Sequence, residues 1–478
     1  MFLPKKNSIL IFFGLFVLIG VFLRAYQLNF ENYWLDEMIS YWVADPNISY
    51  NEALIRREQL GATSPVLFDL ILREYLTFLS YEPKYGRHLP LIFGALSIPF
   101  LGILSHQISK SNSYLLTIFL ASINVYLISY SQEVRPYSLI FFLSIINLIF
   151  YYKLVSKNEK IYKKIIYLNL FVIFSVLMLS SHPFTFIILF SQIINSIYVF
   201  LFFKKKNYLF FLSVFFILFI YLIFNLDYII SHLSYSKYFL AHENWKFYYN
   251  YYFSRFFGSK IMGIIYLSTL IYLVVTLRKK IFYTLNKYLL LIFILIFSYI
   301  IPLAYAYLKT PILTDRYIIF VLIPILILIS SLIFEVTNKK VKIFIFIFIL
   351  APTIINTFIE IKYRKINKPE FKKFLNSVKK NDIKNITVNT NSAISKKASE
   401  IQTKLVGNYI ETLEEFKNND FKIFNLNDVP KNKKMIWVIC YEPLVGFDCT
   451  LPNDKKDTWI LIETKQNHFL NSRLYEIE

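Results

Sequence analysis

Two neighbouring acids, Asp36 and Glu37, stand beside Trp34 a few residues beyond the first long apolar stretch of the chain. Carboxylates at the edge of a membrane can meet lipid-borne substrates from the aqueous side and take a proton from a reacting hydroxyl. The same pair can instead serve only to stabilise the start of a helix, where negative charge is favourable. The sequence by itself leaves both interpretations open.

Two short segments place arginine at the ends of apolar stretches. YSQEVRPY, residues 130–137, contains Glu133, Arg135 and Tyr137, and TDRY, residues 314–317, contains Arg316. The planar fork of donors on arginine suits phosphate oxygens. Either arginine could equally extend its charge towards lipid headgroups, or Arg135 could pair with Glu133. Phosphate binding is therefore a hypothesis that these two segments share.

Other candidates carry less weight. His182 lies in a short turn between Ser181 and Pro183, and a single histidine at a helix end is more often structural. The sequence contains no glycine-rich phosphate loop, no HExxH motif and no cysteine metal cluster. A divalent metal held by Asp36, Glu37 and Glu133 remains an open alternative, and no cofactor is required by the pattern.

These residues must be positioned by membrane helices. The chain has 478 residues, of which 56% are hydrophobic and 19% aromatic, so a globular core could not bury its apolar surface. Apolar stretches of bilayer length recur up to about residue 360. We predict about eleven transmembrane helices, at residues 8–27, 87–107, 112–130, 135–152, 165–181, 183–203, 207–226, 260–277, 288–307, 317–336 and 342–360.

Loop charges predict the orientation. The first apolar stretch lacks a small-residue cleavage site and is interpreted as a retained helix. Lysine and arginine collect in alternate short loops, for example 153–164, 204–206 and 339–342, and such loops tend to stay cytoplasmic. The formal charge of +21 is largely explained in this way, so nucleic-acid binding is not expected. We predict a multi-pass protein of the cytoplasmic membrane with a cytoplasmic N-terminus.

Two regions lie outside the membrane in this scheme. Residues 29–85 form a long first extracytoplasmic loop that we expect to contain interfacial helices, within a transmembrane domain of residues 1–360. Residues 361–478 alternate short β-like runs with helical stretches, which predicts a small extracytoplasmic α/β domain. We expect strands at 386–388, 421–424, 435–440 and 458–462, and helices around 369–378 and 409–417. Cys440 and Cys449 both belong to it and could form a disulfide or remain thiols.

The ordered set of motifs resembles polyprenyl-phosphate-dependent glycosyltransferases of the GT-C fold, such as protein O-mannosyltransferases and lipid A aminoarabinose transferases. The resemblance covers roughly residues 8–340. It is carried, in the family's order, by WLDE, SPVLFDLILREYL with YGRHLPLIFGALSIP, SQEVRPYS, SHPF and DRYIIFVLIP. At Ser64 and Pro65 the chain departs from the His-Pro-Pro of many relatives.

The resemblance implies an inverting transfer of a sugar from a polyprenyl-phosphate donor to an envelope acceptor, which could be a lipid, a glycan or a protein. It makes Asp36 the candidate general base, with Glu37 orienting it or the acceptor. Arg135, Tyr137 and Arg316 become candidate ligands of the donor phosphate. Trp34, Glu133, His182 and Tyr317 are further candidates for substrate contact.

Two other classes of function compete with this one. A lipid or solute transporter would use the outer acids to line a pathway, but transporters tend to carry mid-membrane charges and internal repeats, and neither is evident in the sequence. A non-catalytic membrane scaffold would tolerate neutral replacements of Asp36, Arg135 and Arg316. The acceptor, the sugar and the role of the C-terminal domain are not predicted.

Overall fold

The structure is a computed structural model. It describes residues 6–59, 65–156, 160–203, 207–234, 252–309, 311–379, 383–390, 396–426, 429, 434–441, 451 and 453–477. Its contacts divide the chain into two compact units. Unit 1 comprises Met1–Tyr26, Thr63–Leu67 and Pro90–Arg364, and unit 2 comprises Gln27–Ala62, Phe68–Leu89 and Lys365–Glu478. Most of the long first loop thus groups with the C-terminal residues.

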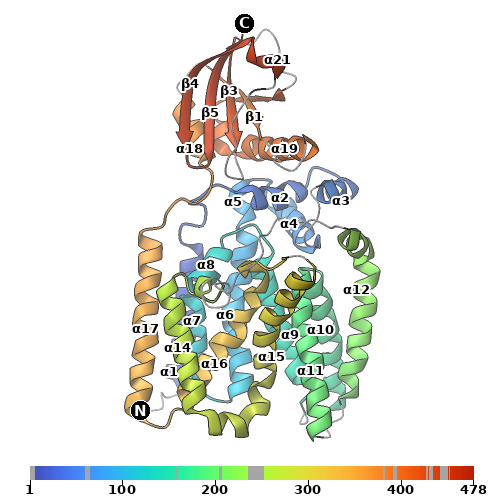
Figure 1. Ribbon diagram of the computed structural model, residues 1–478, viewed down its shortest axis with the longest axis vertical. Coiled ribbons are helices and arrows are strands. Elements are labelled where there is room, and N and C mark those ends of the chain that lie inside the picture. The colour runs from blue at the N-terminus through green and yellow to red at the C-terminus, as the bar shows by residue number, and fades with distance from the viewer. Residues whose placement is uncertain are drawn as a thin grey trace. The chain divides into compact units, whose positions relative to one another are not determined.

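Unit 1 is helical, with long helices that run side by side (Figure 1). Its α-helices are α1 (Lys6–Ala25), α6 (His88–Ser109, whose first residues belong to unit 2), α7 (Ser113–Ser122), α8 (Val125–Tyr130), α9 (Tyr137–Leu154), α10 (Ile161–Leu179), α11 (Phe186–Phe203), α12 (Tyr208–Ser234), α13 (Tyr252–Arg255), α14 (Lys260–Thr276), α15 (Arg278–Leu308), α16 (Leu322–Glu335) and α17 (Lys339–Lys362). Two 3₁₀ helices, η1 (Pro183–Thr185) and η3 (Asp315–Val321), precede α11 and α16.

Within the described residues, nine helices are long and apolar enough to cross a membrane, which makes this a multi-pass membrane protein. They match nine of the expected spans. The expected span at 112–130 is instead divided into two short helices, because Asn124 accepts a hydrogen bond from the backbone nitrogen of Leu127 and starts α8. The span at 260–277 is the 17-residue helix α14.

Helix α16 forms the centre of unit 1. Every residue from Leu322 to Ile333 is buried, as expected for a helix that is apolar on all sides. α7, α14, α15 and α17 pack against it, and α7 also packs against α1; elsewhere in the unit α10 packs against α9 and α12. The outer faces of α1, α12 and α17 remain exposed and apolar, which is the surface that lipid requires.

Unit 2 combines the expected α/β elements with the helices of the first loop. Its helices are α2 (Leu35–Val43), α3 (Tyr50–Gln59), α4 (Leu67–Phe78), α5 (Pro83–Gly86), α18 (Phe371–Val378), α19 (Lys396–Thr412), α20 (Glu414–Lys417) and α21 (Asn453–Lys456). Its strands are β1 (Asn385–Asn389), β2 (Lys422–Phe424), β3 (Met435–Tyr441), β4 (Trp459–Asn467) and β5 (Leu470–Ile477).

The strands form one mixed sheet in the order β2-β1-β3-β5-β4. β1 pairs in parallel with β2 and with β3, whereas β5 pairs antiparallel with β3 and β4. The four expected strands are confirmed. The sequence analysis missed β5 and placed the main helix too late, since α19 begins at Lys396 and not near Tyr409.

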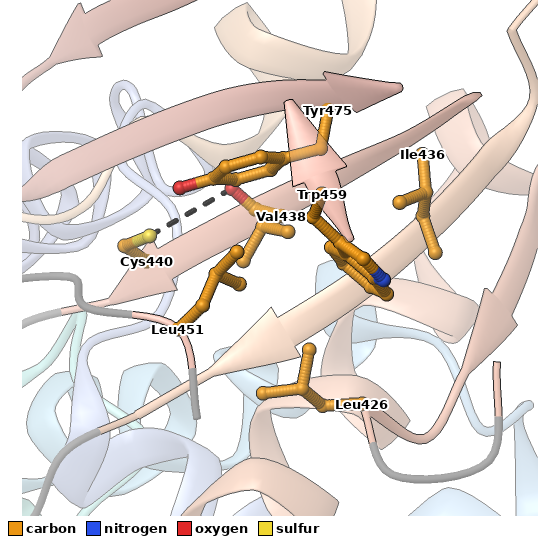
Figure 2. Close-up of a cluster of buried hydrophobic side chains, with 7 residues drawn as sticks. All are labelled: Leu426, Ile436, Val438, Cys440, Leu451, Trp459 and Tyr475. Carbon is orange, nitrogen blue, oxygen red and sulfur yellow. Dashed lines mark hydrogen bonds between the residues drawn. The ribbon is translucent and has the colours of Figure 1, made fainter. Parts of the chain in front are cut away.

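The two faces of the sheet have separate cores. On one face, side chains from β3, β4 and β5 cluster with two loop residues, as Figure 2 shows: Leu426, Ile436, Val438, Cys440, Leu451, Trp459 and Tyr475. On the other face, the ring of Trp437 contacts Phe374 of α18 at a centroid distance of 5.6 Å. Cys440 thus lies in a core, while its possible partner Cys449 lies outside the described residues.

Stacked tyrosines join the first loop to the C-terminal residues inside unit 2. The rings of Tyr33 and Tyr409 stack with centroids 5.0 Å apart, and those of Tyr41 and Tyr81 stack at 4.3 Å. The hydroxyl of Tyr409 also accepts a hydrogen bond from the backbone nitrogen of Tyr33 at 3.0 Å. These contacts fix α2 against α19.

Candidate active site

The segment that carries Arg135 is held in place by short hydrogen bonds. Ser131 donates from Oγ to the carbonyl of Leu127 at 2.6 Å, and Ser138 donates to the carbonyl of Tyr130 at 2.7 Å. Both serines are buried, so these bonds replace contacts with water that the loop cannot make. The turn between α8 and α9 therefore has one defined path.

Gln132 connects this turn to two other parts of unit 1. Its Nε2 donates to the carbonyls of Arg24 and Tyr26 at 2.8 and 2.9 Å, just after α1. Its Oε1 accepts from Arg364, beyond the end of α17, at 2.7 Å. The side chain is only 3% exposed, and its two ends satisfy three partners. Gln132 has a structural role that the sequence analysis did not assign.

Arg135 and Arg316 converge on one aromatic ring. The Cζ atom of Arg135 lies 6.0 Å from the centroid of Tyr137, and the Cζ atom of Arg316 lies 5.7 Å from the same centroid. Tyr137 is the first residue of α9 and is 1% exposed, so its ring is a rigid platform for both cations. The structure thus brings together the three residues that we predicted to bind phosphate.

A third arginine joins this group. Arg255, the last residue of α13, pairs with Asp315 with an Nη1–Oδ1 distance of 3.4 Å. Asp315 is buried and precedes Arg316 directly at the start of η3. The sequence analysis did not select Arg255. Arg255 and Asp315 are 60 residues apart in the chain and meet only in the folded protein. No local motif therefore predicts that Arg255 lies near Arg316.

His182 and Tyr317 are neighbours in the same unit. Their rings lie 4.6 Å apart, and Tyr317 also contacts the ring of Phe184 at 5.3 Å. The Nδ1 atom of His182 accepts a hydrogen bond from the backbone nitrogen of Phe184 at 3.2 Å. A neutral His182 therefore carries its proton on Nε2. Because Tyr317 follows Arg316, this aromatic pair adjoins the arginine group.

Glu133 lies in the same turn as Arg135. Its carbonyl accepts a hydrogen bond from the backbone nitrogen of Arg135 at 2.7 Å, which folds the turn tightly before Pro136. Its side chain is half-buried. Among the described residues, no group of three or more His, Cys, Asp or Glu side chains is arranged to hold a metal ion.

In unit 2, Glu37 is the centre of a buried ion-pair network. It has no exposed surface and accepts hydrogen bonds from Arg87 Nε and Nη2, both at 3.2 Å, and from Lys368 Nζ at 2.7 Å. Burial raises the pKa of its carboxyl, but the charges of Arg87 and Lys368 outweigh burial and lower the pKa to about 2. Glu37 is therefore a poor proton acceptor at neutral pH.

Arg87 extends this network to the backbone of the first loop. Its guanidinium donates to the carbonyls of Leu28, Glu31 and Asn32 at 3.1, 2.6 and 3.0 Å. Each carbonyl belongs to the segment that leads into α2. Arg87 and Glu37 together thus fix the entry to α2, a role that the sequence analysis did not assign to Arg87.

Asp36 and Trp34 lie at the start of α2. Trp34 precedes the helix and donates from its backbone nitrogen to Glu37 Oε2 at 3.4 Å, while Asp36 is half-buried in the first turn. The hydroxyl of Tyr441 accepts a hydrogen bond from the backbone nitrogen of Leu35 at 3.0 Å. Burial raises the pKa of Tyr441, with a smaller contribution from the charge of Asp36, so this hydroxyl stays protonated beside the carboxylate.

The predicted site residues therefore fall into two groups. Unit 1 holds Glu133, Arg135, Tyr137, His182, Arg316 and Tyr317, and unit 2 holds Trp34, Asp36 and Glu37. Within unit 1, ring and cation contacts link all of the predicted residues except Glu133, which is linked through the backbone. Within unit 2, the three residues share one helix start.

Comparisons with known proteins identify solved structures of similar fold. No protein-family model matches the chain, and no curated protein matches its sequence. Among solved structures, ArnT from Cupriavidus metallidurans in the apo state matches with a TM-score of 0.58 and 9% identity, covering 98% of each chain. The same protein bound to undecaprenyl phosphate matches with a TM-score of 0.56 at the same identity and coverage.

A second similar structure comes from an archaeon. The oligosaccharyltransferase AglB from Archaeoglobus fulgidus, in complex with an inhibitory peptide and a dolichol-phosphate, matches with a TM-score of 0.52 and 10% identity. The match covers 92% of this chain and 70% of AglB. The GT-C fold expected from the motifs, with a C-terminal sheet domain, is confirmed by these matches.

Proposed function

We propose that this chain is a membrane glycosyltransferase that moves a sugar from a polyprenyl-phosphate-linked donor to an envelope acceptor, with inversion at the anomeric carbon. One observation carries the proposal: Arg135 and Arg316 converge on the buried ring of Tyr137 in a chain whose fold matches ArnT over 98% of both lengths. Fold alone does not assign a reaction, so the arginine group supplies the chemical argument.

Arg135 and Arg316 bind the donor phosphate in this proposal. The phosphate gains negative charge as the bond to the sugar breaks, so fixed positive donors stabilise the transition state more than the bound donor. The Tyr137 ring, which both guanidinium groups contact, and the hydrogen-bonded turn that carries Arg135 keep the phosphate ligands in place before the donor binds. Arg255 contributes to the same positive region, partly balanced by Asp315.

Asp36 acts as the general base. It removes the proton from the acceptor hydroxyl as the oxygen attacks the anomeric carbon, and the polyprenyl phosphate leaves from the opposite face with the bonding electrons. Glu37 takes no proton, because its carboxylate is already bound by Arg87 and Lys368. It positions Asp36 by fixing the first turn of α2.

The remaining candidates serve the substrates. Trp34 adjoins Asp36 at the start of α2, and Tyr317 with His182 adjoins Arg316, so we assign these rings to contacts with the sugar or the acceptor. Glu133 is a further polar contact. The transfer takes place on the extracytoplasmic face of the cytoplasmic membrane, since the basic loops are on the opposite side in the predicted orientation.

The test compares sugar transfer by membranes that contain wild type or variant protein at matched levels, with a radiolabelled sugar on polyprenyl phosphate as the donor and envelope fractions as the acceptor. Asp36→Asn keeps the shape of the side chain but removes its basicity, and Arg135→Ala removes the guanidinium. Lys309→Ala, at an exposed position, serves as the control.

We expect transfer by wild type and by the Lys309 control, and a loss of at least a hundredfold in both site variants. Equal transfer by Asp36→Asn and wild type would remove Asp36 from the reaction. Absence of transfer from any polyprenyl-phosphate donor would refute the proposed function as a whole.

A further inference from the structure

Unit 2 contains a cavity that has no part in the proposed chemistry. It has a volume of about 540 Å³, within the range of roughly 300 to 1,000 Å³ that is typical of ligand pockets. Its lining comes from the ends of β1 and β2 and from one side of α19. The pocket therefore lies within the C-terminal α/β domain.

The topology of the sheet explains why a cavity forms there. β1 and β2 are parallel, and the chain passes from β1 through α19 to β2 and then back across β1 to β3. In open α/β sheets, ligands bind in the crevice outside the carboxyl ends of such strands. Asn389, the last residue of β1, and Asn425, directly after β2, both line the cavity from these ends.

One face of α19 supplies most of the polar lining. Glu400, Thr403, Lys404, Gly407, Asn408 and Glu411 recur at three- and four-residue intervals and therefore lie on one side of the helix. The opposite side, with Tyr409 stacked on Tyr33, packs against α2. One wall of the cavity is thus the polar side of α19, which suits a polar ligand.

Several lining residues are held by a second layer of contacts. The Oδ1 atom of Asn408 accepts a hydrogen bond from the hydroxyl of Tyr81 at 2.8 Å, which fixes the plane of the amide. The hydroxyls of Thr403 and Thr390 lie 2.8 Å apart. Because these side chains are already oriented, a ligand would bind them at a smaller entropic cost.

Gly407 keeps the cavity open. A Cβ atom added at this position would meet Cδ1 of Ile423 at 3.4 Å, an ordinary van der Waals contact, and no other atom within 4 Å. A larger residue would extend into the cavity.

The chemistry of the lining selects the class of ligand. The lining contains the carboxylates of Glu400 and Glu411 but only one cation, Lys404, which disfavours phosphates and nucleic acids. Its carboxylates, amides and hydroxyls together suit a neutral ligand with many hydroxyl groups. The ring of Phe424 adds an apolar surface on which the C–H face of a sugar can pack. Partial desolvation of its carboxyl raises the pKa of Glu411.

We infer that this cavity binds a neutral oligosaccharide, the glycan portion of the acceptor. The cavity and its chemistry stand by themselves, and only the identification of the bound glycan as the acceptor rests on the proposed function. The C-terminal domain then selects the substrate that receives the sugar, a role that its sequence motifs did not reveal.

The test uses the full-length protein in lipid nanodiscs and fluorescently labelled oligosaccharides, released by mild acid from the envelope of the organism that makes it. Gly407→Leu fills the cavity, and Glu411→Gln changes one carboxylate without changing volume. Gly14→Leu is the matched control, because a side chain at Gly14 meets nothing within 4 Å. Thermal melting of each variant shows whether it remains folded.

We expect wild type and Gly14→Leu to retain labelled glycans. Gly407→Leu should retain at least tenfold less glycan than wild type, and Glu411→Gln several-fold less with an unchanged melting temperature. Failure of wild type to retain any glycan, or full retention by a folded Gly407→Leu, overturns the inference. Sugar transfer is measured on the same preparations. If glycans are retained by wild type but not by Gly407→Leu, and no sugar is transferred, the proposed function is refuted and the saccharide site is confirmed.

Discussion

Replacement of Glu37 by glutamine tests the buried network at the start of α2. The carboxylate accepts three hydrogen bonds from two cations, and Arg87 and Glu37 are both almost completely buried. A glutamine keeps one oxygen but removes the charge, and its amide group would face a cation. Breaking a buried ion pair by removing one partner costs roughly 3–5 kcal/mol, because the remaining charge is left uncompensated.

The pKa of Glu37 gives an independent magnitude. A fall from 4.5 to about 2 corresponds to stabilisation of the folded state by about 3 kcal/mol at neutral pH. A folded-state pKa below the unfolded value means that this stabilisation is complete above pH 4.5 and is lost as the pH falls towards 2. Glu37→Gln should therefore lower stability at pH 7 and have a much smaller effect near pH 2.

The assay is thermal unfolding of purified protein followed by circular dichroism or dye binding, at pH 7 and at lower pH. A loss of 3 kcal/mol or more should lower the melting temperature of the unit by roughly 10 °C. Glu52→Gln is the control, because the Glu52 side chain is 48% exposed and its i,i+4 pair with Arg56 is worth less than about 1 kcal/mol. Melting of Glu37→Gln within about 2 °C of wild type at pH 7 would refute the reasoning.

Three further outcomes are expected. Arg316→Ala should reduce the rate of transfer at saturating donor by about a hundredfold. Arg316→Lys should recover only part of that rate, because lysine keeps the charge but lacks the planar guanidinium donors. Equal rates for both variants and wild type would contradict the phosphate role. Gln132→Ala removes three hydrogen bonds of a buried side chain and should lower the free energy of unfolding by about 2–3 kcal/mol; an unchanged melting temperature would show that the turn does not depend on it. Ile329→Asp places a carboxylate in the buried centre of α16 and should abolish recovery of folded protein in detergent, as judged by gel filtration; a monodisperse wild-type-like peak would contradict the central position of this helix.

The helices were predictable because their signal is local. Most spans are single runs of apolar residues of bilayer length, so composition alone located them to within a few residues. The break at Asn124 was missed, because one asparagine in an apolar stretch does not change the mean hydropathy, although its side chain caps the next helix. Strand β5 was missed because half of LNSRLYEI is polar, and its pairing with β3 and β4 depends on tertiary contacts.

The candidate site was predictable only in part. Arg135, Tyr137 and Arg316 were selected from short motifs, and the structure brings them to one ring. Arg255 and Lys368 were not selected, because their partners, Asp315 and Glu37, are distant in the sequence and come close only in the folded protein. The resemblance already made Asp36 the candidate base and Glu37 an orienting residue, but the residues alone did not separate them. The physical reason that Glu37 is a poor proton acceptor appears only in the structure, where it is buried and bound by Arg87 and Lys368.

The most direct test of the central claim uses purified protein in vesicles, with a polyprenyl-phosphate-linked sugar of known anomeric configuration and the envelope acceptor. The proposal predicts one polyprenyl phosphate released for each sugar transferred, with the opposite anomeric configuration in the product by nuclear magnetic resonance. An intact donor that merely crosses the vesicle membrane would contradict the proposal and indicate transport.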